Sequence, residues 1–158
     1  MDETYIKVHG KWCYLYRAID HDGNLVDSRL SEKRDMDAAK QFFSQAMAAV
    51  GHPPETVTTD GHRSYPRAIR ETMGNEVAHR TNACLNNRIE QDHRGIKQRY
   101  YPMSGFGRVA SAARFCRAFD EVRQFFRIRT TVKQKVSLAQ QRQVFCQRLD
   151  TLQALALV

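Results

Sequence analysis

The order in which hydrophobic periodicity changes along the chain is the feature that most constrains its fold. Residues 3–9, 11–20 and 25–30 carry the alternating, β-branched and aromatic patterns that are typical of strands. The turns between them, at Gly10 and at residues 21–24 (His-Asp-Gly-Asn), are short enough for hairpins. Three strands joined in this way predict an antiparallel meander.

From residue 35 onward the period becomes helical. Asp35 can cap a helix that runs to Val50, and Gly51 followed by a Pro-Pro pair ends it. Strand and helix patterns then alternate, with strands at 55–59 and 76–80 and helices at 64–73, from 87, at 108–129 and at 138–157. This order predicts a mixed five-stranded α/β sheet with helices on both faces. The same order resembles that of the ribonuclease H-like fold.

The distribution of charge points to a polyanionic partner. The net charge is +8 at pH 7, and most of the excess lies late in the chain. Residues 86–148 are rich in arginine, and the acids among them are Glu90, Asp92, Asp120 and Glu121. A sustained arginine excess over several helices favours nucleic acid over a merely solvated surface. The length predicts one domain at 1–130 with a helical extension at 131–158.

Cysteine spacing and hydropathy exclude several classes of protein. The four cysteines lie far apart, and no Cys or His group has the spacing of a zinc site. We therefore expect free thiols in a reducing cytoplasm. The sequence shows neither a signal peptide nor an apolar run of membrane-spanning length, so no membrane partner is expected.

The segment from Asn86 to Arg99 is typical of a basic helix with one acid in its first turn. Glu90, Arg94 and Lys97 lie at i, i+4 and i+7, so they share a face. A carboxylate on a cationic surface suits a metal-dependent enzyme that acts on a polyphosphate. Asn87 and Glu90 also match an ordinary capping box, which is the simpler interpretation of this segment taken alone.

Three acids occupy related places in the expected fold. Asp2 begins the first strand, Asp60 closes the fourth, and Glu90 opens the helix after the fifth. In a ribonuclease H-like sheet these places are neighbours, so the carboxylates would converge. Such a group can hold two divalent cations about 4 Å apart, as phosphodiester chemistry requires. Taken singly, Asp60 could belong to a turn and Asp2 to a frayed terminus.

Three motifs support this arrangement: residues 2–8 (Asp-Glu-Thr-Tyr-Ile-Lys-Val), 58–61 (Thr-Thr-Asp-Gly) with Ser64-Tyr65, and 86–93 (Asn-Asn-Arg-Ile-Glu-Gln-Asp-His) with Lys97. Together they resemble the catalytic domain of DDE transposases from bacterial insertion sequences, and most of all the insertion sequence six family. The resemblance covers residues 2–128. In that family a basic residue follows the glutamate by seven positions, as Lys97 does here.

The resemblance implies a polynucleotidyl transferase that cleaves and transfers DNA strands during transposition. Asp2, Asp60 and Glu90 would be catalytic and would bind two Mg²⁺ ions, for which Mn²⁺ could substitute. The implied partners are transposon ends and target DNA, bound by a homodimer or a larger synaptic assembly in the bacterial cytoplasm at the nucleoid. DNA would be contacted by a set of residues on the basic helix, namely Arg88, His93, Arg94, Lys97 and Arg99.

The chain departs from the family pattern in three places, one of which is the segment after about Thr131, which runs beyond the part that resembles the family. The family normally carries a helix-turn-helix DNA-binding segment ahead of this domain, so we expect an N-terminally truncated protein. The interval from Asp60 to Glu90 is several residues shorter than usual. Two alternatives remain open: a catalytically inactive DNA-binding remnant of a transposase, and a host ribonuclease H-like nuclease. The second alternative does not explain the motifs at 2–6 and 86–93.

Overall fold

The chain is organised as two compact units, Met1–Asp120 and Glu121–Val158. A computed structural model describes residues 1–81, 87–128 and 136–156, and at 87 and 88 it describes the backbone alone. The first unit contains the strands and the predicted site residues. The expected domain boundary after residue 130 lies outside the described residues.

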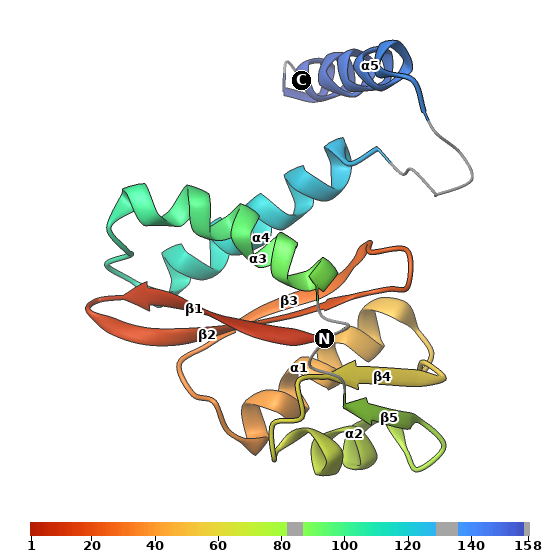
Figure 1. Cartoon of the computed structure of the whole chain (residues 1–158). Coiled ribbons are helices and arrows are strands. Elements are labelled where there is room, and N and C mark those ends of the chain that lie inside the picture. The colour runs from red at the N-terminus through yellow and green to blue at the C-terminus, as the bar shows by residue number, and fades with distance from the viewer. Residues whose placement is uncertain (82–86, 129–135, 157–158) are drawn as a thin grey trace. The chain divides into compact units, whose positions relative to one another are not determined.

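The first unit begins with an antiparallel sheet in the strand order β1-β2-β3 (Figure 1). Its strands are β1 (Asp2–Val8), β2 (Lys11–Ile19) and β3 (Leu25–Ser31). Each strand pairs with the next along the chain, and the only break in register lies between Ala18 and Ile19. The predicted meander is therefore confirmed.

The two later strands, β4 (Thr56–Thr59) and β5 (Ala78–Thr81), form a separate parallel pair. All five predicted strands are thus present in the predicted order, but their hydrogen bonds form two sheets in place of one continuous sheet. The amine of Met1 donates to the Thr58 carbonyl at 2.8 Å. Because Met1 directly precedes β1, this hydrogen bond joins the start of β1 to the end of β4 across the two sheets.

Helices cover both faces of the three-stranded sheet (Figure 1). On one face, α1 (Met36–Val50) and α2 (Tyr65–Met73) share a core with Tyr16 of β2 and with β4. On the other face, α3 (Asn87–Tyr100) and the start of α4 (Val109–Phe126) pack on β1 and β2. Successive β2 side chains enter opposite cores, as the period of a strand requires.

The segment between α3 and α4 returns to the edge of β1. A short 3-10 helix, η1 (Tyr101–Met103), follows α3 directly. The Phe106 amide then donates to the Lys7 carbonyl at 3.0 Å, and the His9 amide donates to the Phe106 carbonyl at 2.6 Å. This bridge ties the end of β1 to the start of α4.

The helix α1 has the boundaries that its capping residues predict. The Asp35 side chain accepts a hydrogen bond from the Ala38 amide at 2.9 Å. At the other end Gly51 adopts a φ of 86°, and its amide donates to the Met47 carbonyl. Glycine reaches this left-handed conformation without steric cost, which explains why the helix ends there.

Replacing Asp35 by alanine is expected to lower the free energy of unfolding by about 1 kcal/mol, because the Ala38 amide loses its acceptor. Urea denaturation of Asp35→Ala and Asp35→Ser would measure the effect. The serine variant should recover most of the loss, since its hydroxyl can accept the same hydrogen bond. Equal losses in both variants would contradict a capping role.

The second unit contains the end of α4 and the helix α5 (Leu138–Ala156). The rings of Phe126 and Phe145 pack with centroids 4.9 Å apart. Arg148 donates to the Phe125 carbonyl at 2.6 Å and to the Arg127 carbonyl at 2.9 Å. These contacts hold α5 to the end of α4. None of the described helices combines the length and the apolar character needed to cross a membrane.

Candidate metal-binding active site

Three carboxylates gather where β1 begins and β4 ends. Asp2 and Glu3 start β1, and Asp60 directly follows β4. One oxygen from each lies within 4.8 Å of the others. Carboxylate oxygens are hard ligands that Mg²⁺ and Mn²⁺ prefer, so a divalent cation fits at this group. The sequence predicted that Asp2 and Asp60 would be neighbours, but it did not single out Glu3.

The third predicted acid, Glu90, lies in the first turn of α3 with its side chain exposed. It does not belong to the group formed by Asp2, Glu3 and Asp60 among the described residues. The residues that lead into α3, 82–86, lie outside the described part of the chain. The structure therefore brings two of the three predicted acids together and does not place Glu90 within the same 4.8 Å group.

Asp2 lies in a partly buried position beside other charges. Burial is the main cause that raises its pKa to about 6, and the nearby carboxylates of Glu3 and Asp60 add to the shift. Its Oδ1 accepts a hydrogen bond from the Glu3 amide at 2.9 Å. A bound cation stabilises the ionised form of a carboxylate, and this stabilisation matters most where burial makes ionisation costly.

Replacing Asp2 by asparagine is expected to stabilise the metal-free chain at neutral pH. The folded chain keeps the Asp2 proton up to a pKa of about 6, whereas an ordinary aspartate releases it near 3.8. Between these values the unfolded chain binds fewer protons, so stability falls as the pH rises. At about 1.4 kcal/mol for each pKa unit the full shift would cost about 3 kcal/mol above pH 6, and solvent screening of this partly exposed carboxylate lowers the expected cost to about 1–2 kcal/mol.

Urea denaturation in the presence of a chelator would test this prediction. The Asp2→Asn variant should be more stable than the wild type at about pH 7 and equal to it at about pH 4. Glu76→Gln, which changes an exposed acid, is the matched control, and its stability should equal that of the wild type at both pH values. A variant no more stable than the wild type at pH 7 would contradict the prediction.

The predicted DNA-contacting residues of α3 lie in different surroundings. Arg94 and Arg99 are exposed and Lys97 is half-buried. The ring of His93 is buried instead, and its Nδ1 lies 3.9 Å from Asp2 Oδ2. Burial lowers the pKa of His93 to about 3, so the ring is neutral at physiological pH. The side chain of Arg88 lies outside the described residues.

A family model described as a DDE domain, of the IS240 type, matches residues 1–129. The chain belongs to this family. It is similar to two transposases of Staphylococcus aureus, those of the insertion sequence-like element IS431mec and of IS257 in transposon Tn4003. Each is 40% identical over 102 residues, which are 63% of this chain and 46% of the relative. The chain thus spans about half the length of these curated relatives.

Two further comparisons extend this picture of the DDE domain. An uncharacterized protein of Yersinia pseudotuberculosis, pYV0051, is 41% identical over 75 residues, 46% of this chain and 70% of that protein. A chain in the structure of the simian T-cell lymphotropic virus intasome, in complex with PP2A regulatory subunit B56 gamma, superposes with a TM-score of 0.59 at 16% identity. The match covers 91% of this chain and 52% of that one, and shows the fold alone. The predicted ribonuclease H-like fold and transposase resemblance are confirmed.

The DDE domain also contains a buried ion pair that the sequence did not predict. Arg17 of β2 and Asp120 of α4 approach to 2.5 Å, and their side chains are 2% and 1% exposed. The positive charge of Arg17 also helps to lower the pKa of His93, after burial. The pair therefore links the sheet to α4 on the side of the domain where His93 contacts Asp2.

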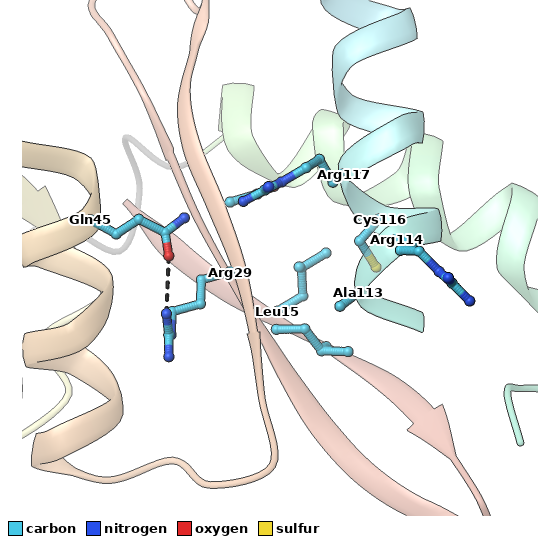
Figure 2. A pocket seen from close by; sticks show the side chains of 9 residues that line it. Leu15, Arg29, Gln45, Ala113, Arg114, Cys116 and Arg117 are labelled. Atoms are coloured by element: carbon cyan, nitrogen blue, oxygen red, sulfur yellow. Dashed lines mark hydrogen bonds between the residues drawn. The ribbon is translucent and has the colours of Figure 1, made fainter. Parts of the chain in front are cut away.

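The DDE domain also has an arginine-lined pocket of about 330 Å³ at the β3 edge (Figure 2). In it, Arg29 donates to Gln45 of α1 at 3.0 Å. Arg114 and Arg117 of α4 are exposed, and no acidic side chain belongs to the described lining. This pocket shares no lining residue with the carboxylate group, so it is a separate basic feature of the same unit.

Proposed function

We propose that this chain is the catalytic part of an insertion-sequence transposase, which cleaves DNA strands and transfers them to target DNA. The observation that carries the proposal is the convergence of Asp2 and Asp60 in a domain whose family model matches residues 1–129. These are two of the acids that the transposase motifs predict. The relatives named as transposases support the same function.

In this proposal the catalytic groups are the carboxylates of Asp2, Asp60 and Glu90. Asp2 and Asp60 would hold cations at the meeting point of β1 and β4, and Glu90 would complete the ligand set from the first turn of α3. Two Mg²⁺ ions, or Mn²⁺ in their place, would supply activation of the attacking hydroxyl and stabilisation of the leaving oxygen. His93 would order Asp2 from within the fold, since its ring is buried.

The strand-transfer step would be an in-line displacement at phosphorus. A DNA 3′ hydroxyl loses its proton and forms a new P–O bond with a target phosphodiester, while the bond to the target's own 3′ oxygen breaks. The exposed cations of α3, Arg94 and Arg99, with Lys97 beside them, would hold the DNA phosphates. Arg88 is proposed for the same role.

The decisive experiment uses a pre-cleaved end of the element that encodes the chain. Joining of this end to target DNA is expected in Mg²⁺ or Mn²⁺ and should stop when the ions are chelated. Joining that is equally fast in Glu90→Gln would show that any activity has a different chemistry. Crosslinking during joining would test the proposed homodimer or larger synaptic assembly, which requires more than one chain per DNA complex.

A catalytically inactive DNA-binding remnant is the second candidate. It is favoured by the position of Glu90 outside the carboxylate group of the described residues. In either case DNA affinity should fall steeply with salt. A plot of the logarithm of the binding constant against the logarithm of the salt concentration should have a slope of about −0.9 for each phosphate contact. The double variant Arg94→Ala with Arg99→Ala should lose about two phosphate contacts, so the slope should become shallower by the corresponding amount. A slope unchanged in the double variant would exclude this face of α3.

A further inference from the structure

The carboxylate of Glu3 is held differently from those of Asp2 and Asp60. Its side chain is only 2% exposed, although it belongs to the acidic group at the start of β1. A buried carboxylate is costly unless charged or hydrogen-bonding partners surround it. Glu3 has such partners on both oxygens: the Tyr65 hydroxyl donates to Oε2, and the Arg34 guanidinium forms an ion pair with Oε1.

Arg34 connects this buried carboxylate to the exposed rim of the site. It lies in the segment between β3 and α1, and its side chain is 29% exposed. The nitrogen that contacts Glu3, Nη2, also lies 3.5 Å from Asp60 Oδ2. The other oxygen of Asp60 accepts from the His62 amide at 3.1 Å. The orientation of Asp60 is therefore fixed from two sides.

We propose that Arg34 is a positioning residue for Asp60 and that Glu3 is the anchor of Arg34 rather than a further metal ligand. This inference rests on the proposed function, because it assigns roles to residues of the same carboxylate group. Tyr65 belongs to the anchor, since it occupies the Glu3 oxygen that faces α2.

The charges of the site make this assignment distinguishable from a metal-ligand role for Glu3. If Arg34 neutralises Glu3, the pair adds little net charge beside Asp2 and Asp60. Removing the Glu3 charge alone leaves an uncompensated guanidinium next to the cation site, which repels the cation. Removing both charges restores the balance. If Glu3 is instead a ligand, its loss weakens cation binding whether or not Arg34 is present.

The test is Mn²⁺ binding by the chain without DNA, followed by electron paramagnetic resonance, in Glu3→Gln, Arg34→Met and the double variant. Glu3→Gln is expected to weaken binding by about 10-fold or more, because like charges a few Å apart interact strongly even when screened. The double variant should bind within about 3-fold of the wild type. Binding in the double variant that stays as weak as in Glu3→Gln would overturn the proposal and make Glu3 a ligand.

The positioning role of Arg34 has a separate readout. In strand transfer at saturating Mn²⁺, Arg34→Met and the double variant should be slower than the wild type by about 10-fold, since Asp60 loses one of its two contacts. Arg34→Lys should recover part of the rate, because an ammonium can still bridge the two carboxylates. Full activity of Arg34→Met would overturn the positioning role.

A matched control separates these effects from loss of stability. Phe42→Leu alters the same core, where Phe42 stacks on Tyr16, and it removes no charge. It should lower the unfolding temperature and leave Mn²⁺ binding unchanged, and weaker binding in this control would overturn the charge interpretation. If the wild type joins no DNA with any metal, the proposed function fails, and the Mn²⁺ binding of the charge variants still decides the role of Glu3.

Discussion

The Glu90→Gln variant is expected to lose strand transfer by roughly 10³-fold while it keeps its fold. Glutamine has the size of glutamate, but its neutral amide is a much weaker cation ligand. Metal-assisted stabilisation is worth several kcal/mol in the transition state, and about 1.4 kcal/mol corresponds to a tenfold change in rate. Because the Glu90 side chain is exposed, no core contact is lost with its charge.

The measurement is the single-turnover rate of joining a pre-cleaved end at saturating Mg²⁺, with thermal unfolding recorded in parallel. Glu121→Gln is a suitable control, because it also removes an exposed helical acid from the basic half of the chain. It should leave the rate within about 2-fold of the wild type, as surface substitutions usually do. Equal rates for Glu90→Gln and Glu121→Gln would refute a catalytic role for Glu90.

The second large effect concerns stability, at the buried pair of Arg17 and Asp120. Asp120→Ala is expected to cost about 3–5 kcal/mol, because it leaves a buried guanidinium without its counter-charge. Two of the Arg17 nitrogens, Nε and Nη1, already lack a hydrogen-bond partner within the described part of the chain. The remaining charge would therefore have few ways to be compensated inside the fold.

Urea denaturation would measure this loss, which is a large share of the stability of a typical domain. Because Asp120→Ala could fail to fold at all, the double variant Arg17→Met with Asp120→Leu provides the second arm. Replacing a whole buried pair by apolar side chains is often neutral, so this variant should fold with a stability near that of the wild type. A double variant as unstable as Asp120→Ala would contradict the explanation.

Local interactions explain why the elements could be predicted from the sequence. The hairpin turn at residues 21–24 and the capping of α1 by Asp35 involve groups only a few positions apart. Such contacts form whatever the distant chain does. The acids Asp2 and Asp60 were identified in the same way, by the motifs that surround them, and the comparisons confirm the family to which those motifs belong.

Burial of charged groups was much harder to predict. Glu3 stood on the polar side of an alternating strand pattern, yet the packing of α1 and α2 covers the start of β1 and encloses it. Asp120 did carry a signal: it follows the buried Cys116 by four residues and so shares its face of α4. Its partner, Arg17, comes from a strand far away in the sequence, and no local pattern links the two.

The sequence by itself determined the strands, the helices and the family, since these depend on local periodicity and on specific motifs, and the fold of that family in turn predicted that Asp2 and Asp60 would be neighbours. Only the tertiary structure decided how the five strands divide into two sheets, which charges are buried, and that Arg34 joins Glu3 to Asp60. The physical reason is that desolvation and ion pairing act between residues that only folding brings together, and one sequence contains no direct record of those distances.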